Sequence, residues 1–501
     1  MKPLDANAIA KASGVVALRD AFDGAQRSKS ILRTASSPDA SAALRVVSPG
    51  EVIKRAVELD GVITQDGIAR VFAERYAERL RFCHDSGAWY KWTGTHWQRD
   101  NTDRAFHFAR ELGREFTEGA KAGELKEVRR VIFAGGVERF ARSDPAFAVT
   151  AEDWDRHPYL LGTPGGTVDL RIGRLQAADP AEGITKTTGV EPSDTAECPR
   201  WREFLAQATG CDTALVRFLQ QWTGYCLTGN TSAHALVFVY GPGGNGKSVF
   251  LNTVIGILGD YAATAAMDTF TAAHSDKHPT DLAMLRGARL VTASETEEGR
   301  AWAESRIKQM TGGDPISARF MRQDFFTYRP QFKLMIVGNH KPLLRNVDDA
   351  ARRRFNIVPF TVKPDAPDLQ LEEKLQAEWP GILRWAIDGC LDWQRNGLVR
   401  PESVVAATDD YFSDQDLFGH WLQEDCDAEP GNGYKTETSG ALFASWSSFS
   451  MRAGEKSGSQ KGFAAEMQKR GFVSDRVTGG KRIFRGVRLP VERHPSDGSD
   501  G

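Results

Sequence analysis

One stretch of the sequence constrains the fold more than any other: an apolar run, a glycine-rich loop and a second apolar run between residues 234 and 258. Residues 235–240 predict a buried strand, and residues 249–258 predict an apolar helix that ends near Gly259. The loop between them, a full match to G-x-x-x-x-G-K-[ST], consists of Gly241, Pro242, Gly243, Gly244, Asn245, Gly246, Lys247 and Ser248.

This strand–loop–helix context predicts a phosphate-binding loop that takes ATP and Mg²⁺. Glycines let backbone N–H groups approach a triphosphate closely, where a side chain would clash. Lys247 is expected to reach the β- and γ-phosphates, and Ser248 is expected to bind Mg²⁺. We expect nucleotide contacts from Gly241 through Val249. The alternative, a glycine-rich turn with a chance lysine, is disfavoured because a strand and a helix flank the loop.

Three further apolar runs predict strands at 288–294, 332–338 and 355–360. Strands that alternate with helices predict an α/β fold with a mostly parallel, doubly wound sheet. A phosphate loop is shared by kinases, GTPases, transporters and motors, so the residues that follow these strands must decide the reaction.

The predicted strands end in residues suited to nucleotide hydrolysis. Glu295 follows the 288–294 run and could support Mg²⁺ and polarise the attacking water, although acids after a strand are common. Asn339 follows the 332–338 run and could orient that water. The sequence Asn339-His-Lys-Pro is not the Asn-Lys-x-Asp of guanine recognition, which weakens a GTPase interpretation. Three arginines at 352–354 form either a solvated basic turn or a finger that reaches a neighbouring subunit's ATP.

This order of motifs resembles superfamily 3 helicases, in particular the phage and plasmid primase-helicase branch related to satellite-phage and poxvirus replication helicases. The resemblance covers roughly residues 60–490. It implies a AAA+-like core in a hexameric ring that translocates on single-stranded DNA. It also implies that Lys247 and Ser248 are the Walker A pair, Glu295 the Walker B acid and a metal ligand, Asn339 sensor 1, and Arg353 or Arg354 the finger.

The same resemblance implies DNA contacts in the central channel. Lys308 and the predicted hairpin at 315–330, with Arg319 and Arg322, would face the DNA. The sequence departs from some relatives that carry two adjacent acids, because Thr296 separates Glu295 from Glu297. Whether Glu297 participates stays open. About sixty residues precede the match, which we interpret as too few for the primase domain that the family often carries.

We expect seven segments: a disordered tail at 1–48, an α+β domain at 49–199, a helical collar at 200–232, the ATPase core at 233–365, a helical lid at 366–400, a winged-helix DNA-binding domain at 401–490 and a second disordered tail at 491–501. The hairpin at 89–97 is rich in aromatic residues. These could stack on bases, but packing on a small core is the favoured interpretation.

Charge is balanced overall but not locally. The whole chain has a net charge of −2. Between Arg452 and Arg488, ten Lys/Arg stand against three Asp/Glu, a local charge of +7. This is the electrostatic footprint of phosphate binding, with Lys481 and Arg482 as candidate DNA contacts, and the alternative is a solvated basic face.

The six cysteines form no C-x-x-C pair, and no apolar run has transmembrane length, so we expect a protein of the bacterial host cytoplasm.

These observations predict an ATP-dependent DNA helicase of phage, prophage or plasmid replication. Its expected partners are single-stranded and forked DNA, further copies of itself, and a separate primase or polymerase. One alternative is the helicase half of a primase-helicase whose primase is a separate chain. The other is an initiator or loader that uses ATP to assemble on an origin without unwinding.

Overall fold

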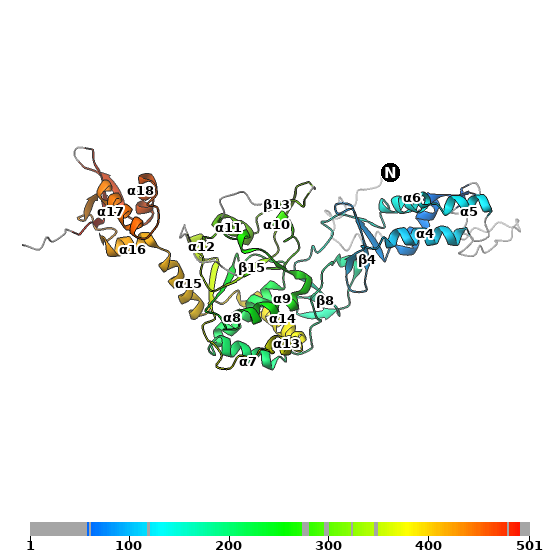
Figure 1. The fold of residues 1–501 in the computed structure, drawn as a ribbon, viewed down its shortest axis with the longest axis horizontal. Helices are drawn as coiled ribbons and strands as arrows, with labels where there is room; N and C mark the ends of the chain where they lie inside the picture. The colour runs from blue at the N-terminus through cyan, green and yellow to red at the C-terminus, as the bar shows by residue number, and fades with distance from the viewer. Residues whose placement is uncertain are drawn as a thin grey trace, which may run out of the picture. The chain divides into compact units, whose positions relative to one another are not determined.

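The computed structural model describes residues 58–59, 62–117, 121–272, 280–294, 300–321, 324–344, 349–477 and 480–490 (Figure 1). The chain divides into two units, residues 1–67 and residues 68–501. In the first unit β1 (Glu58–Leu59) pairs antiparallel with β2 (Val62–Ile63). All elements that follow α3 (Gln65–Tyr76) belong to the second unit.

The predicted α+β region opens the second unit. Its four-stranded sheet has the order β5-β4-β3-β6, and three helices follow β5. The bounds are β3 (Leu80–Cys83), β4 (Ala88–Trp92), β5 (Trp97–Arg99), β6 (Ala148–Val149), α4 (Arg104–Phe116), α5 (Ala122–Val128) and α6 (Val131–Arg142). A three-stranded antiparallel sheet comes next, formed by β7 (Leu160–Thr163), β8 (Gly166–Asp169) and β9 (Arg174–Gln176).

The predicted aromatic hairpin is present, because β4 and β5 pair antiparallel. Trp89 and Trp97 are both buried. Trp89 Nε1 donates to Glu138 Oε1 at 2.6 Å, and Trp97 Nε1 donates to the carbonyl of Pro180 at 2.9 Å. Buried indoles with satisfied N–H groups are core residues, so the favoured packing interpretation is confirmed for these two tryptophans.

A five-stranded sheet lies at the centre of the second unit, and every pair of neighbouring strands in it is parallel. Its order is β11 (Ala262–Thr264), β12 (Leu290–Ser294), β15 (Lys333–Gly338), β10 (Leu236–Tyr240) and β16 (Phe355–Pro359). The four strands expected from apolar runs are all present. Such runs are typical of parallel strands, which are covered on both faces.

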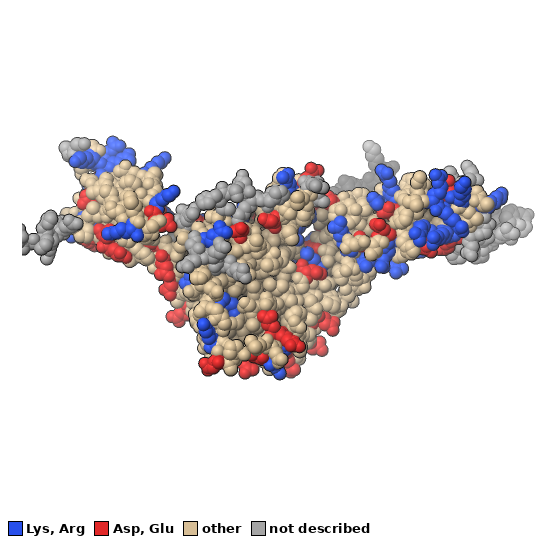
Figure 2. Space-filling model, in the orientation of Figure 1, with Lys and Arg blue, Asp and Glu red and all other residues tan. Residues whose placement is uncertain are grey.

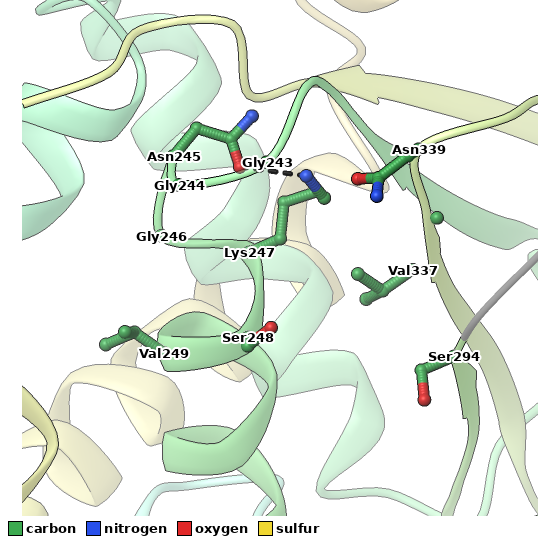
Figure 3. Close-up of a pocket in the computed structure, with 11 residues that line it drawn as sticks. Gly243, Gly244, Asn245, Gly246, Lys247, Ser248, Val249, Ser294, Val337 and Asn339 are labelled. Carbon is green, nitrogen blue, oxygen red and sulfur yellow. Dashed lines mark hydrogen bonds between the residues drawn. The ribbon is translucent and has the colours of Figure 1, made fainter.

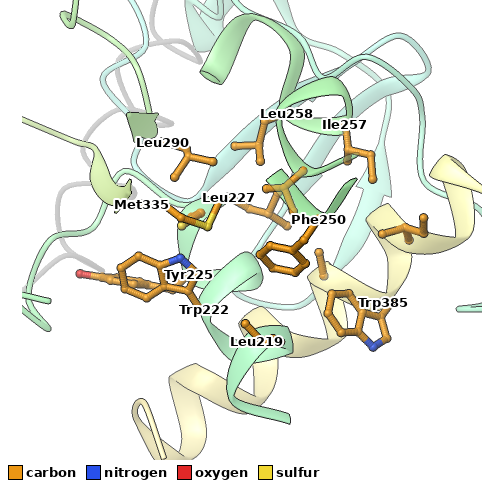
Figure 4. Packing of buried hydrophobic residues seen from close by; sticks show 14 of the residues in the cluster. Leu219, Trp222, Tyr225, Leu227, Phe250, Ile257, Leu258, Leu290, Met335 and Trp385 are labelled. Carbon is orange, nitrogen blue, oxygen red and sulfur yellow. The ribbon is translucent and has the colours of Figure 1, made fainter. Parts of the chain in front are cut away.

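Successive side chains of β10 point to opposite faces of this sheet and enter two different cores. Val237 and Val239 join a core formed with α7 (Pro199–Ala208), α8 (Thr213–Cys226), α9 (Lys247–Leu258) and α14 (Trp379–Asn396). Figure 4 shows side chains of α8, α9 and α14 in this core. Leu236 and Phe238 join the other core, together with residues of α11 (Glu304–Gly312) and α15 (Glu402–Asp414).

The segments expected to be a collar and a lid pack against each other in the first of these cores. α14 lies along α8, and α13 (Leu371–Gln376) contacts α7 and α9. Trp201 of α7 stacks on Phe250 of α9 with ring centroids 5.6 Å apart, and Trp385 of α14 meets Trp201 edge-on. The helix that opens the predicted C-terminal domain, α15, packs on β16 of the central sheet.

A separate core lies between α16 (Leu417–Glu424), α17 (Ser439–Arg452) and α18 (Gln460–Lys469), built on Phe418, Trp421, Trp446 and Phe463. These are the three short helices that the sequence predicts. The predicted hairpin also forms, since β19 (Val473–Arg476) pairs antiparallel with β20 (Arg482–Arg485), and β18 (Thr436–Thr438) completes the sheet. β17 (Asp427–Ala428) and β21 (Val487–Arg488) form a two-stranded sheet.

Among the described residues, no helix is both long enough and apolar enough to cross a membrane.

Candidate nucleotide site

Backbone geometry explains why glycines occupy the loop between β10 and α9. Gly244 and Gly246 have φ angles of 77° and 82°, in the left-handed region that other residues rarely adopt. Gly246 is also the N-cap of α9. A Cβ at Gly241 would collide with the carbonyl oxygen of Phe360, which directly follows β16. The loop is therefore held against the sheet edge at one end and turns tightly into the helix at the other.

Lys247 is folded back onto this loop (Figure 3). Its Nζ donates to the carbonyl of Gly241 at 2.7 Å, to the carbonyl of Pro242 at 2.9 Å and to Asn245 Oδ1 at 2.9 Å. The side chain of Asn245 donates in turn to the carbonyl of Phe360. Burial lowers the pKa of Lys247, and the positive charge of Lys363 lowers it further. Because these three acceptors are neutral oxygens, an anion entering the loop would compete well for the ammonium.

A cavity of about 570 Å³ opens beside the loop. It is lined by Gly243 to Val249 and by the ends of two neighbouring strands, Ser294 of β12 and Val337 to Asn339 at the end of β15. In Figure 3 the Asn339 side chain points toward the ammonium of Lys247, and the Ser248 and Ser294 hydroxyls lie on the same side of the loop. The structure thus brings together three residues predicted from the sequence, Lys247, Ser248 and Asn339.

Two lining features were not predicted. Ser294, Val337 and Gly338 line the cavity although none of them carries a charge, and only the strand-end positions beside Glu295 and Asn339 point to them. The predicted Walker B acid Glu295, like Glu297, lies outside the described residues, so its position stays a prediction. Ser294, the residue before Glu295, reaches the cavity.

The ranges that the structure describes contain no group of three or more His, Cys, Asp or Glu side chains arranged to hold a metal ion. A metal bound with the phosphates needs fewer protein ligands than that. Mg²⁺ is usually held by one or two side-chain oxygens together with substrate phosphates, and the exposed Ser248 hydroxyl beside the cavity fits this role.

The three arginines at 352–354 do not line this chain's own cavity. Arg352, the last residue of α12 (Asp349–Arg352), pairs with Asp409 at 3.2 Å and lies over the ring of Phe412. Arg354 Nη1 donates to the carbonyl of Ala350 at 2.7 Å. Arg353 between them is exposed. Two of the three guanidinium groups are thus engaged within the chain.

The predicted hairpin at 315–330 forms between β13 (Ile316–Ala318) and β14 (Phe326–Tyr328). Arg319 lies over the ring of Phe325, 4.8 Å from its centroid, and Lys308 is half-buried on α11. Arg322 lies outside the described residues. The hairpin also exposes Met321 (70%) and Phe325 (61%), two apolar side chains that the sequence pattern did not single out.

Lys481 directly precedes β20 and Arg482 begins it, and both side chains are exposed. Nearby cations of the same segment are paired: Arg485 with Asp475 at 2.6 Å and Arg488 with Asp427 at 2.7 Å. Figure 2 shows lysines and arginines gathered over the part of the molecule that carries α17 and α18. Figure 2 also shows lysines and arginines gathered over the helices α4 to α6. The sequence of 62–150 did not suggest this, because its basic and acidic residues are nearly balanced in number.

Two family models match the chain. Residues 69–210 match the family described as "D5 N terminal like", and residues 239–354 match a family of unknown function, DUF5906. The second match begins in β10 and ends at Arg354, so it contains the phosphate loop and both strand ends of the cavity.

Three similar viral proteins bear the name "Putative helicase". L207/L206 of Acanthamoeba polyphaga mimivirus is 23% identical over 396 residues, which is 74% of this chain and 39% of that protein. For 022R of Frog virus 3 the identity is 25% over 47% of this chain and 27% of that protein, and for 121R of Invertebrate iridescent virus 3 it is 25% over 44% and 25%. The chain therefore spans about two fifths or less of these relatives.

The chain is thus similar to the "D5 N terminal like" family over residues 69–210 and to viral proteins named as putative helicases. Among solved structures, the apo NrS-1 C terminal region aligns with 84% of this chain and 98% of its own length, at a TM-score of 0.48 and 10% identity. The "D5 N terminal like" match runs from α3 through the end of α7. α7 directly precedes α8 and packs on α9, the helix of the phosphate loop. The two matched regions are therefore in contact beside the candidate nucleotide site.

Proposed function

We propose that this chain is the motor of a DNA replication helicase, which hydrolyses ATP at the interfaces of a hexameric ring and moves along single-stranded DNA. The helicase names of the relatives and the "D5 N terminal like" match support a replication role. One observation carries the proposal furthest: Lys247, Ser248 and Asn339 surround one cavity at the carboxyl ends of parallel strands. Ligands bind in this position in open α/β sheets.

The proposed chemistry follows from the positions of these residues. Backbone N–H groups of the loop and the start of α9 bind the phosphates of ATP. Lys247 exchanges its three neutral acceptors for β- and γ-phosphate oxygens, with which its charge interacts more strongly. Mg²⁺ held by Ser248 and Glu295 would supply further neutralisation of phosphate charge.

Asn339 orients a water molecule in line with the γ-phosphorus, and Glu295 accepts its proton. The water oxygen bonds to the γ-phosphorus while the bond to the β–γ bridging oxygen breaks, which releases ADP and phosphate. The Asn339 amide is neutral, so it can position the water without competing for the proton. Arg353 of a neighbouring subunit stabilises the charge on the transferred group, a contribution worth roughly 10³–10⁵ in rate where such fingers have been measured.

We further propose that residues 416–489 form a winged helix that binds DNA. The order α16, β17, β18, α17, α18, β19, β20 places a hairpin directly after the last of three helices. That hairpin presents the exposed Lys481 and Arg482, whose charges are suited to phosphate contacts.

A strand-displacement assay tests the motor. The parent protein is expected to separate a forked duplex when ATP and Mg²⁺ are present, and duplexes with a 3′ or a 5′ tail will give its polarity. Lys247→Ala is expected to displace no strand, because the charge of the triphosphate is no longer neutralised. DNA-stimulated ATP hydrolysis without strand displacement on any substrate would contradict the motor and favour an origin-binding loader.

A further inference from the structure

A second cavity, of about 640 Å³, has no lining residue in common with the cavity beside the phosphate loop. Most of its wall comes from four segments that are distant in the sequence: residues 151–156 after β6, residues 185–186, residues 286–287 before β12, and residues 327–331 at the end of β14. Its volume falls within the range of roughly 300–1,000 Å³ that is usual for small-molecule sites. The cavity is therefore large enough for a ligand of its own.

Each of the four segments contributes one basic side chain to the wall, namely Arg156, Lys186, Arg286 and Arg329. Lys186 Nζ donates to the backbone carbonyl of Asp260 at 3.0 Å, and Arg286 Nη2 donates to the carbonyl of Ala151 at 3.5 Å. Within the described ranges, no ion pair joins any of the four to a carboxylate. Four cations thus meet at one cavity, although the sequence of the whole chain is nearly neutral.

The two acids of the wall, Glu152 and Asp155, offset only part of this charge. The Asp155 carboxylate accepts from the backbone N–H of Thr185 at 2.9 Å and from the Thr185 hydroxyl. Glu152 is exposed. Four basic and two acidic side chains leave an excess of two positive charges in the lining. Because a concave surface lined mainly by one sign of charge concentrates its field, the cavity favours an anionic ligand.

The turn that carries Trp154 and Arg156 into the wall has an unusual backbone. Asp155 between them has a φ of 48°, in the left-handed region that residues other than glycine rarely adopt. Its N–H donates to the carbonyl of Gly183 at 3.0 Å, and its carboxylate is held by Thr185. Such conformations persist only where the surrounding structure fixes them, and they cluster at ligand sites. The structure therefore sets the positions of Trp154 and Arg156 before any ligand binds.

Aromatic rings are the third component of the wall. Tyr90 of β4 and Trp154 are both half-buried, and their ring centroids lie 4.8 Å apart. Aromatic faces beside cations are the combination with which proteins bind nucleotide units, because bases stack on the rings while the cations meet the phosphates. A simple inorganic anion would make no use of the rings. The lining as a whole therefore suits a nucleotide better than an inorganic anion.

We propose that this cavity is a second nucleotide-binding site, which holds a phosphate between its four cations and a base against its two aromatic rings. The proposal goes beyond the proposed function, because the site does not include the phosphate loop. A free nucleotide and a unit of single-stranded DNA share this chemistry, and the experiment below separates the two sources. Two of the cations lie in the region matched at 69–210 and two in the region matched at 239–354, so a bound nucleotide would contact both.

The double variant Arg156→Ala, Arg329→Ala tests the site, and both side chains are exposed, so the fold should tolerate their loss. The probes are thymidine monophosphate in calorimetry and a fluorescent oligothymidylate in anisotropy. We expect the variant to bind at least one of them tenfold or more weakly than the parent protein does. A loss for thymidine monophosphate identifies a free nucleotide as the ligand. A loss for oligothymidylate alone identifies single-stranded DNA, and its salt slope should then fall by about two units.

Two further variants test which part of the molecule and which side chains bind the probe. Lys247→Ala should bind the same probe with parental affinity, which separates this site from the phosphate loop. Tyr90→Leu keeps an apolar side chain on β4 and removes the ring, so it should weaken binding roughly tenfold. Parental affinity in Tyr90→Leu would overturn the assignment to a nucleotide.

The matched control is the double variant Arg174→Ala, Arg395→Ala, which removes the same charge from two exposed positions that line neither cavity. It should bind both probes as the parent protein does. Equal affinities of the control and the Arg156→Ala, Arg329→Ala variant for both probes would overturn the site. Failure of the parent protein to bind either probe would also overturn it, while the proposed ATP hydrolysis at the phosphate loop would stand.

Discussion

Asn339 has a testable role of its own at the scale of single residues. Its amide lines the phosphate cavity but directly follows β15, so it lies outside the loop that would bind the phosphates. We therefore expect Asn339→Ala to bind ATP with nearly the parental affinity and to hydrolyse it about 100-fold more slowly, as when a single positioning donor is removed. Equilibrium binding and steady-state turnover give the two quantities.

A control for that variant is available on α9. Asn252 is exposed and donates to Glu372 Oε1 at 3.1 Å, away from the cavity lining. Asn252→Ala should retain parental turnover. Parental turnover in Asn339→Ala would remove Asn339 from the proposed mechanism.

Lys333 is the clearest source of pH-dependent stability. It is 2% exposed, its Nζ donates to the carbonyl of Thr228, and it lies 4.8 Å from the ring centroid of Tyr225. Burial lowers its pKa from the ordinary value of 10.5 to about 7. Below pH 7 the folded and unfolded chains both bind this proton. Above pH 7 the folded chain releases it first, so stability rises with pH, by up to about 1.4 kcal/mol per pH unit.

Urea unfolding between pH 7 and 8.5 measures how the free energy of unfolding changes with pH. This range lies below the ordinary pKa of cysteine, so the buried cysteines contribute little to the change. Lys333→Met keeps a long side chain and removes the titrating group. The variant should show a flatter dependence of unfolding free energy on pH. An identical slope in the parent protein and Lys333→Met would assign the dependence to other groups.

At the scale of elements, α15 connects the segment that follows Asn339 to the start of the predicted C-terminal domain. Tyr411 of α15 donates its hydroxyl proton to the carbonyl of Pro342 and accepts from Trp302 Nε1 at 2.9 Å. Pro342 lies three residues after Asn339. Tyr411→Phe would leave a buried N–H and a buried carbonyl without these partners, at a cost of about 1–3 kcal/mol for each group left unsatisfied.

Denaturant unfolding should show this cost as a lower free energy of unfolding for Tyr411→Phe. Tyr434→Phe makes the same substitution at a side chain that is 98% exposed, and it should change stability by less than about 0.5 kcal/mol. Equal stabilities of the two variants would show that the Tyr411 hydroxyl does not hold α15 to the core.

Local sequence patterns predicted the helices and strands of this fold better than they predicted which of them pack together. Apolar runs predicted β10, β12, β15 and β16, because strands buried on both faces are apolar along their length. They missed β11, whose sequence Ala-Ala-Thr is short and weakly apolar. The helical lid at 366–400 was predicted, but the packing of α14 against α8 depends on tertiary contacts that no local pattern specifies.

The residues of the candidate site show the same difference between local pattern and packing. Lys247 and Ser248 were predictable because they belong to a motif that follows a strand, and Asn339 because it directly follows another strand. The position of α7 beside the loop was not predictable, because it depends on tertiary packing of Trp201 and Phe204 against Phe250, Trp385 and Gly246. Glu295 and Arg322 stay predictions, since both lie outside the described residues.

At the scale of the whole molecule, local charge matters more than the net charge of −2. Lys481 and Arg482 are exposed on the C-terminal hairpin, whereas Arg485 on the same strand is paired with Asp475. The double variant Lys481→Ala, Arg482→Ala should weaken DNA binding and reduce its salt slope by about two units, because each side chain neutralises one phosphate. Arg485→Ala should change the slope less. A slope unchanged in the double variant would place the DNA elsewhere.

The ring is tested by mixing two inactive proteins. Arg352 is engaged with Asp409 and Phe412, and Arg354 with the carbonyl of Ala350, which leaves the exposed Arg353 as the best candidate finger. None of these arginines lines the chain's own cavity, so a finger would have to serve a neighbouring subunit. In a ring, each active site then takes its phosphate loop from one chain and its finger from the next.

Arg353→Ala and Lys247→Ala proteins are each expected to lack ATPase activity when assayed alone. In a mixed ring, an interface that combines the intact loop of the Arg353→Ala chain with the intact finger of the Lys247→Ala chain forms a complete site. Mixtures should therefore regain part of the parental ATPase activity, with a maximum at intermediate ratios of the two proteins. The same experiment with Arg354→Ala tests the neighbouring candidate. If replacing all three arginines leaves hydrolysis intact, the active site is complete within one chain, and a site shared between subunits is refuted.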